Sequence, residues 1–455
     1  MTDHEENQTR DWERIHREAK LVDVHTHATL KASFFGWWYD RENRKSPDSL
    51  AKRKDYRVFN PFKFRTAFPL LQAGSADVLL TAASVPEGEL LPTFLGQRWL
   101  VDLIARLPII SGVHRRFIAP PYYEATRSMM KALEASVQEY AAFAASHKRR
   151  PVEVVCTVDR LRAISAMGDD APIALIHAIE GAHCLNGVRA GKSLQDAAAV
   201  HRRERETPVA IQEEILANLR SLFEAGVACM TLAHFYPNYV AAPIYPYPEF
   251  AVKYIDVLGD SEATLIAYDP TLGLTPFGET VVREMFSLGM LVDVTHSTPA
   301  ARKRVYELAV ETGQGHRVIA SHVGVYALNP TPYNLEDWEI AWIAAHGGIV
   351  GVIFMNYWLQ PHEREMGLNY LSRTIEHIIW AGGERGADTV ALGTDFDGFT
   401  DPPDEIAHYG HMPRLTQRLL AEYFADGAKY SDETIKKILG GNALRVLLNG
   451  WGRRD

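Results

Sequence analysis

Short apolar runs recur along the chain, and most of them are apolar on both faces of an extended segment. Strands of this kind are typical of a parallel sheet that helices cover on its faces. The longer stretches between the runs carry apolar residues at helical spacing. The predicted strands are 21–25, 77–84, 172–179, 227–233, 290–295, 317–321, 348–354 and 389–394.

Two of the helical stretches have clear ends. The segment 209–225 is followed by Gly226, and the segment 298–312 is followed by Gly313. Glycine commonly follows a helix because it adopts left-handed backbone angles readily. Eight strands that alternate with helices predict an α/β protein with a (β/α)8 TIM barrel rather than an open sheet.

The predicted strands are unevenly spaced, and long insertions follow the first, second and fourth. No Gly/Ser-rich linker marks a second domain, so we expect residues 1–455 to form one barrel domain. The insertion at 31–70 could form a lid over the end of the barrel, or it could pack on the barrel or on a partner subunit. Its aromatic and first basic residues are Phe34, Phe35, Trp37, Trp38, Tyr39, Arg41, Arg44 and Lys45.

The composition narrows the class of protein. Of the 455 residues 47% are hydrophobic and the net charge is −9, which argues against a disordered chain and against a general nucleic-acid binder. No apolar run reaches the ~18 residues of a membrane helix, and the first twenty residues lack the apolar segment of a signal peptide. Cys156, Cys184 and Cys229 have no CxxC spacing, so neither a disulfide framework nor a thiolate zinc site is expected. We expect a soluble, cytoplasmic protein with no membrane or nucleic-acid partner.

Residues with metal-binding and acid–base chemistry follow most of the predicted strands. The active sites of (β/α)8 barrels form where the carboxyl ends of the strands converge, so these residues would meet there. A single histidine beside a strand is more often a hydrogen-bonded core residue, but six strand ends in phase are hard to ascribe to chance. The strand-end residues are His25, His27, Glu180, His234, His296, His322 and Asp395.

The ligand types fit two divalent metal ions. His25 and His27 are two residues apart, so both can face the same side of a strand and hold one ion. His296 and His322 would hold the second, and Glu180 would bridge the two. Each ion then has three protein ligands and an open position, as catalytic zinc prefers. Zinc is favoured by the histidines, although manganese, cobalt or iron would accept the same ligands.

The remaining two strand-end residues fit hydrolysis. A water held between two such ions loses its proton near neutral pH and becomes a bridging hydroxide nucleophile. Asp395 would take a proton from it and pass the proton to the leaving nitrogen, while His234 would stabilise the oxyanion. None of the strand ends carries a lysine, which argues against a site bridged by a carbamylated lysine.

Several longer motifs resemble the membrane (renal) dipeptidase family of metal-dependent peptidases. They are 273–298 (GLTPFGETVVREMFSLGMLVDVTHST), IASHVGVY, AIEGAH, TLAH, ALGTDFDG and GGNALRVL. The resemblance implies an amidohydrolase-type barrel with a binuclear zinc site that hydrolyses dipeptides. By motif position, Glu180 corresponds to the bridging ligand, His296 and His322 to ligands of the second metal, His234 to the substrate-contacting histidine and Asp395 to the catalytic aspartate.

The chain departs from this family in two places. The family's first motif usually reads His-x-Asp, and here it reads His25-Thr26-His27. Imidazole is a competent zinc ligand, so we expect the metal to be retained. The family's arginine for the dipeptide carboxylate corresponds to Tyr333, and a tyrosine hydroxyl does not replace a bidentate guanidinium.

Three functions remain open from the sequence. The first is a binuclear zinc dipeptidase-like hydrolase that cleaves an amide bond in a dipeptide-like small molecule, with Tyr333 and His234 contacting the substrate. The second applies the same metal chemistry to an N-acyl amino acid, a cyclic amide or a lactone. The third is a non-catalytic binding barrel. Family resemblance and the aromatic content also make a homodimer plausible.

Overall fold

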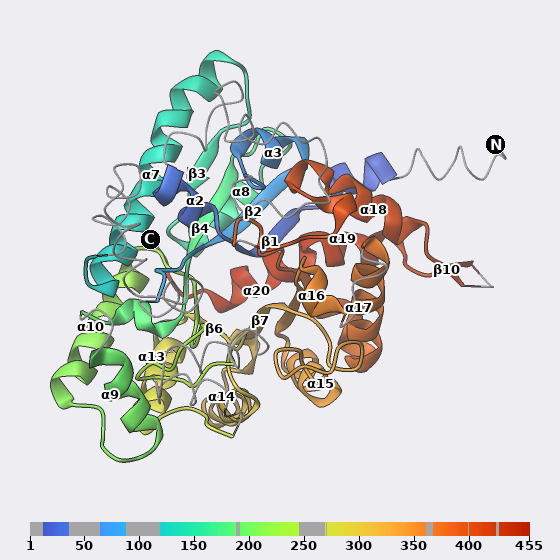
Figure 1. The fold of residues 1–455 in the computed structure, drawn as a ribbon. Coiled ribbons are helices and arrows are strands. Elements are labelled where there is room, and N and C mark those ends of the chain that lie inside the picture. The colour runs from blue at the N-terminus through green and yellow to red at the C-terminus, as the bar shows by residue number, and fades with distance from the viewer. Residues whose placement is uncertain are drawn as a thin grey trace.

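The computed structural model describes residues 12–35, 64–87, 119–187, 192–244, 269, 271–360, 367–398, 400–424 and 427–455. Eight parallel strands close into a barrel, because β2 pairs with β4 on one side and β1 with β9 on the other. Helices surround the strands (Figure 1). The barrel strands are β1 (Leu21–Thr26), β2 (Ala76–Ala83), β4 (Ile173–Glu180), β5 (Cys229–Thr231), β6 (Leu291–Asp293), β7 (Val318–Val323), β8 (Ile349–Val352) and β9 (Val390–Leu392).

The (β/α)8 prediction is therefore confirmed, and each of the eight predicted strands is present. The sequence interpretation missed the two-residue strands β10 (Tyr423–Phe424) and β11 (Gly427–Ala428), which form a separate antiparallel pair. It also missed the three-residue strand β3 (Val152–Val154). This strand pairs with the amino-terminal half of β4, while β5 pairs with the carboxyl-terminal half. A three-residue strand gives too short a pattern to be recognised.

The helices α13 (Pro276–Leu288) and α14 (Pro299–Thr312) begin and end in the same way. Each follows a threonine whose hydroxyl accepts a hydrogen bond from the first turn, and each ends at a glycine with left-handed backbone angles. The predicted helix at 298–312 corresponds to α14, and the one at 209–225 corresponds to α10 (Val209–Glu224). The other helices are α2 (Ala28–Phe35), α3 (Phe68–Ala73), α7 (Tyr122–Ser146), α8 (Val158–Ser165), α9 (Lys192–His201), α15 (Asp337–His346), α16 (Asn356–Leu359), α17 (Leu368–Ala381), α18 (Pro413–Leu420), α19 (Asp432–Lys436) and α20 (Asn442–Gly450).

One end of the barrel is closed by a helix. Interior strand residues such as Val22 and Ile176 belong to the same buried cluster as Val446 and Trp451, in and just after α20. Side chains alternate along a strand, so Glu180 lies on the same face of β4 as Ile176. The cluster thus fills the barrel from its amino-terminal end, and Glu180 projects from the opposite end.

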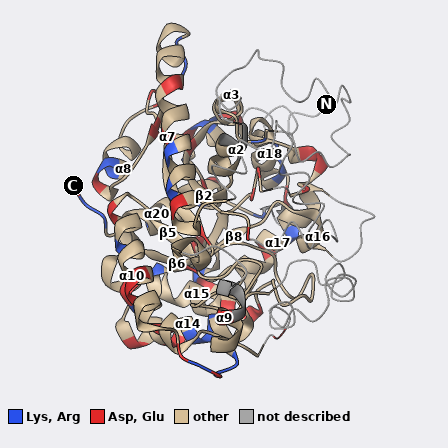
Figure 2. Cartoon of the chain, turned by 60° about the vertical axis from the view of Figure 1, so that its left-hand side comes forward, with Lys and Arg blue, Asp and Glu red and all other residues tan. Residues whose placement is uncertain are grey.

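Charged residues of both signs cover the outer helices (Figure 2). Arg220 of α10 pairs with Glu284 of α13 at 2.6 Å, and Arg304 of α14 pairs with Glu279 of α13 at 2.7 Å. Exposed pairs of this kind contribute about 0–1 kcal/mol each, so they order neighbouring helices rather than create the fold.

The lid predicted at 31–70 falls on residues that are only partly described. The proposed lid at 31–70 lies mostly outside the described residues, and the described parts are the end of α2 and residues 64–70 with the start of α3. Residues Trp37, Trp38 and Tyr39 also lie outside them. Over the described part of the chain, no helix combines the length and the apolar character needed to cross a bilayer.

Candidate metal centre

The side chains predicted from the strand ends come together at the carboxyl-terminal end of the barrel. Two of them lie within β1 and β7, one ends β4, and the others lie in the loops that follow β1, β5, β6 and β9. Each exposes 8% or less of its surface. The seven residues are His25, His27, Glu180, His234, His296, His322 and Asp395.

Glu180 lies at the middle of this group. Its Oε1 is 3.3 Å from Nε2 of His25, and its Oε2 is 3.3 Å from Nε2 of His27. The two imidazole nitrogens are 3.2 Å apart. His25, His27 and Glu180 therefore offer three ligand atoms close enough to hold one metal ion.

A second set of three shares the same carboxylate. Oε1 of Glu180 is 3.2 Å from Nε2 of His296 and 3.6 Å from Nε2 of His322. These two nitrogens are 3.0 Å apart. Glu180, His296 and His322 thus form the second group, and Glu180 is the residue common to both groups.

The distances and the unpaired atoms both fit metal ligation. Two nitrogens, each ~2.0–2.1 Å from one tetrahedral zinc ion, lie about 3.3 Å apart, close to the separations found here. Among the described residues, Oε2 of Glu180 and Oδ1 of Asp395 are buried acceptors without a hydrogen-bond donor. Buried polar atoms normally have partners, so these two acceptors are open to a cation. The donor set of imidazole and carboxylate is one that zinc accepts.

A third possible ligand set, which includes Asp293 with His25 and His322, is less suited to an ion. Oδ1 of Asp293 accepts hydrogen bonds from the backbone N–H groups of Thr295 and Ser321. Its Oδ2 accepts from the hydroxyls of Thr231 and Ser321. The carboxylate is therefore occupied in joining β5, β6 and β7.

The carboxylate of Asp23 likewise joins β1 to the residues after β9 through hydrogen bonds. Its Oδ1 accepts from the backbone N–H groups of His25 and Thr394, and its Oδ2 accepts from the Thr394 hydroxyl. Burial raises the pKa of Asp23 to about 7, against the lowering effect of these hydrogen bonds. Asp23 and Asp293 form a layer of carboxylates beneath the histidines that the sequence interpretation did not identify.

The charge of Glu180 controls the protonation of its neighbours. Burial disfavours the charged form of His25, but attraction to Glu180 and a hydrogen bond with it raise the pKa of His25 to about 9. Burial alone would raise the pKa of Glu180, yet the surrounding imidazoles hold it well below its usual range. Burial and the neighbouring imidazoles lower the pKa of His322, and neutral imidazole is the form that binds a metal.

Asp395 lies beside the first group of ligands. Its Oδ1 is 3.1 Å from Nε2 of His27 and 3.9 Å from Nε2 of His25. Its backbone is left-handed, with φ of +54°, and its N–H donates to the carbonyl of His25. His296 also has a positive φ, of +64°. Such angles are uncommon outside glycine and indicate that the surrounding structure holds these residues in place.

His234 also contacts the carboxylate of Glu180. Its Nε2 is 3.5 Å from Oε2 of Glu180, and its Nδ1 is 3.0 Å from Oε2 of Glu87. Glu87 is a buried residue that the sequence interpretation missed. It follows the second predicted strand by three residues, so the strand-end rule applied to that strand would have found it.

The ring of Trp358 separates Tyr333 from the candidate ligand His322. Tyr333 stacks on Trp358, with ring centres 4.7 Å apart, and Trp358 lies parallel to His322 at 6.1 Å. Tyr333 is 5% exposed. The structure therefore places Tyr333 in an aromatic layer beside the site, and its role in substrate binding stays a prediction.

Two neighbouring residues support the site through hydrogen bonds. Nε2 of His183 is 2.9 Å from the carbonyl of Val85. The carboxylate of Asp397 accepts from the backbone N–H groups of Arg65 and Thr66, so it fixes the turn after β9 to residues 65–66.

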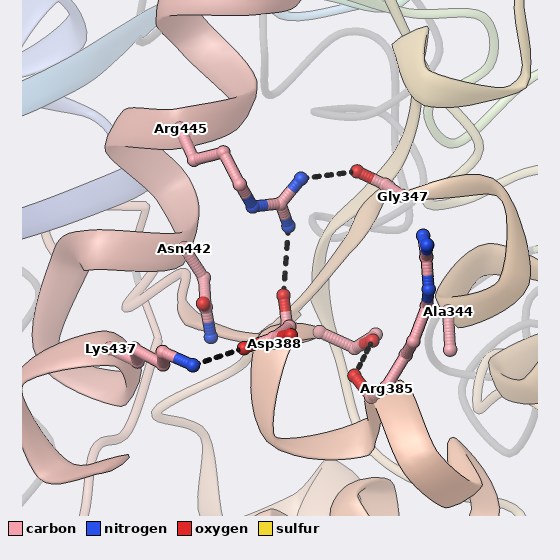
Figure 3. A pocket seen from close by; sticks show the side chains of 9 residues that line it. Ala344, Gly347, Arg385, Asp388, Lys437, Asn442 and Arg445 are labelled. Atoms are coloured by element: carbon pink, nitrogen blue, oxygen red, sulfur yellow. Dashed lines mark hydrogen bonds and ion pairs between the residues drawn. The ribbon is translucent and has the colours of Figure 1, made fainter. Parts of the chain in front are cut away.

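A cavity of about 380 Å³ lies at the other end of the barrel (Figure 3). Its lining includes residues that directly precede β8 and β9. Arg445 donates to the carbonyls of Gly347 and Asp388, each at 2.8 Å, and Lys437 pairs with the Asp388 carboxylate at 2.7 Å. These groups attach α20 and the residues just before it to the turns that precede β8 and β9, so this cavity is distinct from the candidate metal centre.

Comparison with known proteins gives the family. A model of the membrane dipeptidase family (peptidase family M19) matches residues 209–449. An uncharacterized protein in the pqqA 5' region of Klebsiella pneumoniae is 35% identical over 179 residues, 39% of this chain and 62% of that protein. Dipeptidase tcpJ of Claviceps purpurea is 28% identical over 229 residues, 50% of this chain and 46% of that protein. The matched segments thus span less than two thirds of these curated relatives.

Solved structures share the fold over nearly the whole chain. A metallo peptidase from Rhodobacter sphaeroides, liganded with a phosphinate mimic of the dipeptide L-Ala-D-Ala, has a TM-score of 0.61 at 18% identity, covering 95% of this chain and 99% of that one. The probable dipeptidase PvdM from Pseudomonas aeruginosa has a TM-score of 0.61 at 16% identity, covering 97% and 98%. The family match extends over more than half of the 455 residues and confirms the resemblance seen in the motifs, so the protein belongs to the membrane dipeptidase family, a family of hydrolytic enzymes.

Proposed function

We propose that the protein is a binuclear zinc hydrolase that cleaves the amide bond of a dipeptide or a dipeptide-like small molecule. One observation carries the proposal: the carboxylate of Glu180 lies 3.2–3.6 Å from Nε2 of four imidazoles that belong to other strands or their loops. Family membership and the dipeptide mimic bound by the Rhodobacter sphaeroides protein support the choice of substrate class.

The candidate ligands form two groups, and each group would hold one ion. His25 and His27 would hold one, His296 and His322 the other, and Glu180 both. When bound, the ions would supply Lewis acidity and activate a shared water as the nucleophile. The other steps depend on the chain's own residues.

Asp395 is suited to move the proton. Its Oδ1 is buried, has no hydrogen-bond donor among the described residues, and faces His27 at 3.1 Å. A carboxylate at the edge of the ligand group can take a proton from a nearby water and pass it to the leaving nitrogen. The left-handed backbone at Asp395 and the bond from its N–H to His25 hold the carboxylate in place for both transfers.

His234 is suited to stabilise the oxyanion. Its Nε2 is 3.5 Å from Oε2 of Glu180, the oxygen that also contacts Nε2 of His27. A donor fixed in a buried site stabilises developing negative charge more strongly than one in water does.

A second substrate class is favoured by the position of Tyr333. Where the family carries an arginine for the substrate carboxylate, this chain has a tyrosine that is buried against Trp358. An N-acyl amino acid, a cyclic amide or a lactone would react at the same metals and need no clamp for a terminal carboxylate.

The decisive experiment is a hydrolysis screen of the zinc-loaded protein. L,L- and L,D-dipeptides, N-acyl amino acids and lactones would be compared, and zinc content measured in the same preparation. We expect about two zinc ions per chain and turnover of at least one class. A chain that binds no zinc after reconstitution would instead support a non-catalytic barrel. Cytoplasmic location and a homodimer stay predictions for fractionation and light scattering.

A further inference from the structure

The buried carboxylate of Glu87 has no assigned task in the chemistry above, although it contacts His234. Its Oε2 is 3.0 Å from Nδ1 of His234, and the Glu87 side chain is 5% exposed. Glu87 follows β2, whereas His234 follows β5, so the contact joins two strand ends that are 147 residues apart.

The same carboxylate also holds the backbone of the loop that carries the histidine. Oε1 accepts from the backbone N–H of Tyr236 at 2.9 Å, and both oxygens lie within 3.3 Å of the N–H of Phe235. The ring of Phe235 stacks on the ring of His234, with centres 3.7 Å apart. The backbone position, the ring plane and one ring nitrogen of His234 are therefore fixed together.

The carboxylate of Glu87 is ionised in this environment. Burial would raise the pKa of Glu87, but the imidazoles of His183 and His234 and the backbone N–H of Tyr236 lower it overall. An ionised carboxylate only accepts hydrogen bonds, so Nδ1 of His234 must donate its proton to it. The other nitrogen, Nε2, then points toward Glu180 at 3.5 Å and is the only ring nitrogen available to the substrate.

We propose that Glu87 is a positioning residue that fixes the direction of the His234 ring, so that Nε2 of this histidine faces the reacting group. The inference rests on the proposed hydrolase function. A carboxylate that orients a catalytic histidine in this way is a general device, because the hydrogen bond at one nitrogen determines the chemistry of the other.

A double-mutant cycle tests the coupling. We expect Glu87→Gln to lower kcat by ~10–100-fold, with KM and zinc content nearly unchanged, because glutamine keeps the shape but loses the charge that holds Nδ1 of His234 and the backbone N–H groups of its loop. In a His234→Ala background, Glu87→Gln should lower kcat by less than ~3-fold, since residues that act as a unit are non-additive. Equal effects in both backgrounds would overturn the proposal.

A spectroscopic measurement separates this inference from the proposed function. In zinc-loaded protein with ¹⁵N-labelled histidine, we expect Nδ1 of His234 to carry a proton that is hydrogen-bonded to Glu87, and Glu87→Gln to weaken this hydrogen bond. A wild-type protein in which Nδ1 of His234 is bare would overturn the proposal whether or not any substrate is cleaved. Absence of turnover with an Nδ1 proton present would instead contradict the hydrolase function alone.

The chain offers a matched control. Glu134 of α7 pairs with His177 of β4, at 3.3 Å between Oε1 and Nε2, away from the metal ligands. Glu134→Gln removes a carboxylate from a histidine in the same way but should leave kcat and the signals of His234 unchanged. A loss of kcat equal to that of Glu87→Gln would also refute the specific role of Glu87.

Discussion

Replacing Glu180 by glutamine isolates the charge of the shared carboxylate, because the two side chains have nearly the same shape. The imidazole nitrogens of both ligand groups lie 3.2–3.6 Å from its oxygens. An ion in contact with these groups would lie within ~4 Å of the carboxylate, where a unit charge and a divalent ion attract by about 8 kcal/mol at an effective dielectric constant of ~20. Since ~1.4 kcal/mol is a tenfold change in affinity, each ion should bind more weakly by a factor on the order of 10⁵–10⁶.

The assay is zinc content after equilibrium dialysis, together with the melting temperature with and without zinc. Wild-type protein should retain about two ions and be stabilised by them, because a ligand that binds only the folded state raises its stability. Glu180→Gln should lose both ions together, whereas Glu134→Gln, whose histidine partner lies outside the site, should lose neither. Retention of both ions in Glu180→Gln, or loss of only one, would refute the shared-ligand reasoning.

Three other changes give separate expectations. Asp395→Asn should keep the zinc content but lower kcat by ~10²–10⁴-fold, and near-normal turnover would assign the proton transfer elsewhere. In Gly398→Ala the added Cβ would lie 2.2 Å from Oδ1 of Asp395, so kcat should fall by ~100-fold with an unchanged circular dichroism spectrum. Gly168→Ala, where nothing lies within 4 Å, is its control, and equal activities of the two would contradict the steric argument. Burial lowers the pKa of His201 from 6.5 to about 4, so between these values the unfolded chain binds a proton that the folded chain does not. The free energy of unfolding should therefore fall by up to ~3 kcal/mol as the pH drops from 6.5 to 4, and His201→Gln should flatten this slope in denaturant titrations.

The barrel was predictable because its strands are buried on both faces. Runs such as Ile173–Glu180 read as continuous apolar segments, and the Thr-Pro starts and glycine ends of α13 and α14 mark helix boundaries. The strand-end rule then located the residues of the candidate site, since the fold brings the carboxyl ends of all strands together. The pattern could not reveal β3, because Val152–Val154 is too short to show a period.

What the sequence could not predict depends on contacts between distant segments. Asp23 and Asp293 are single acidic residues within strands, and their role is visible only when their hydrogen-bond partners are known. The stacking of Tyr333 on Trp358 likewise depends on how a loop packs on α16, across 25 positions in the chain. The left-handed backbone of Asp395 could not be predicted either, because aspartate is usually found at negative φ.

The carboxylates of Asp23 and Asp293, beneath the histidines, have a consequence for how the protein acquires its ions. They are bonded to backbone groups and hydroxyls of adjacent strands, and these bonds involve no metal. The chain alone therefore holds the strands beneath the histidines in place, without a cation as a template. Loading should then be a fast docking step onto a finished scaffold, and one divalent ion should be exchangeable for another without refolding.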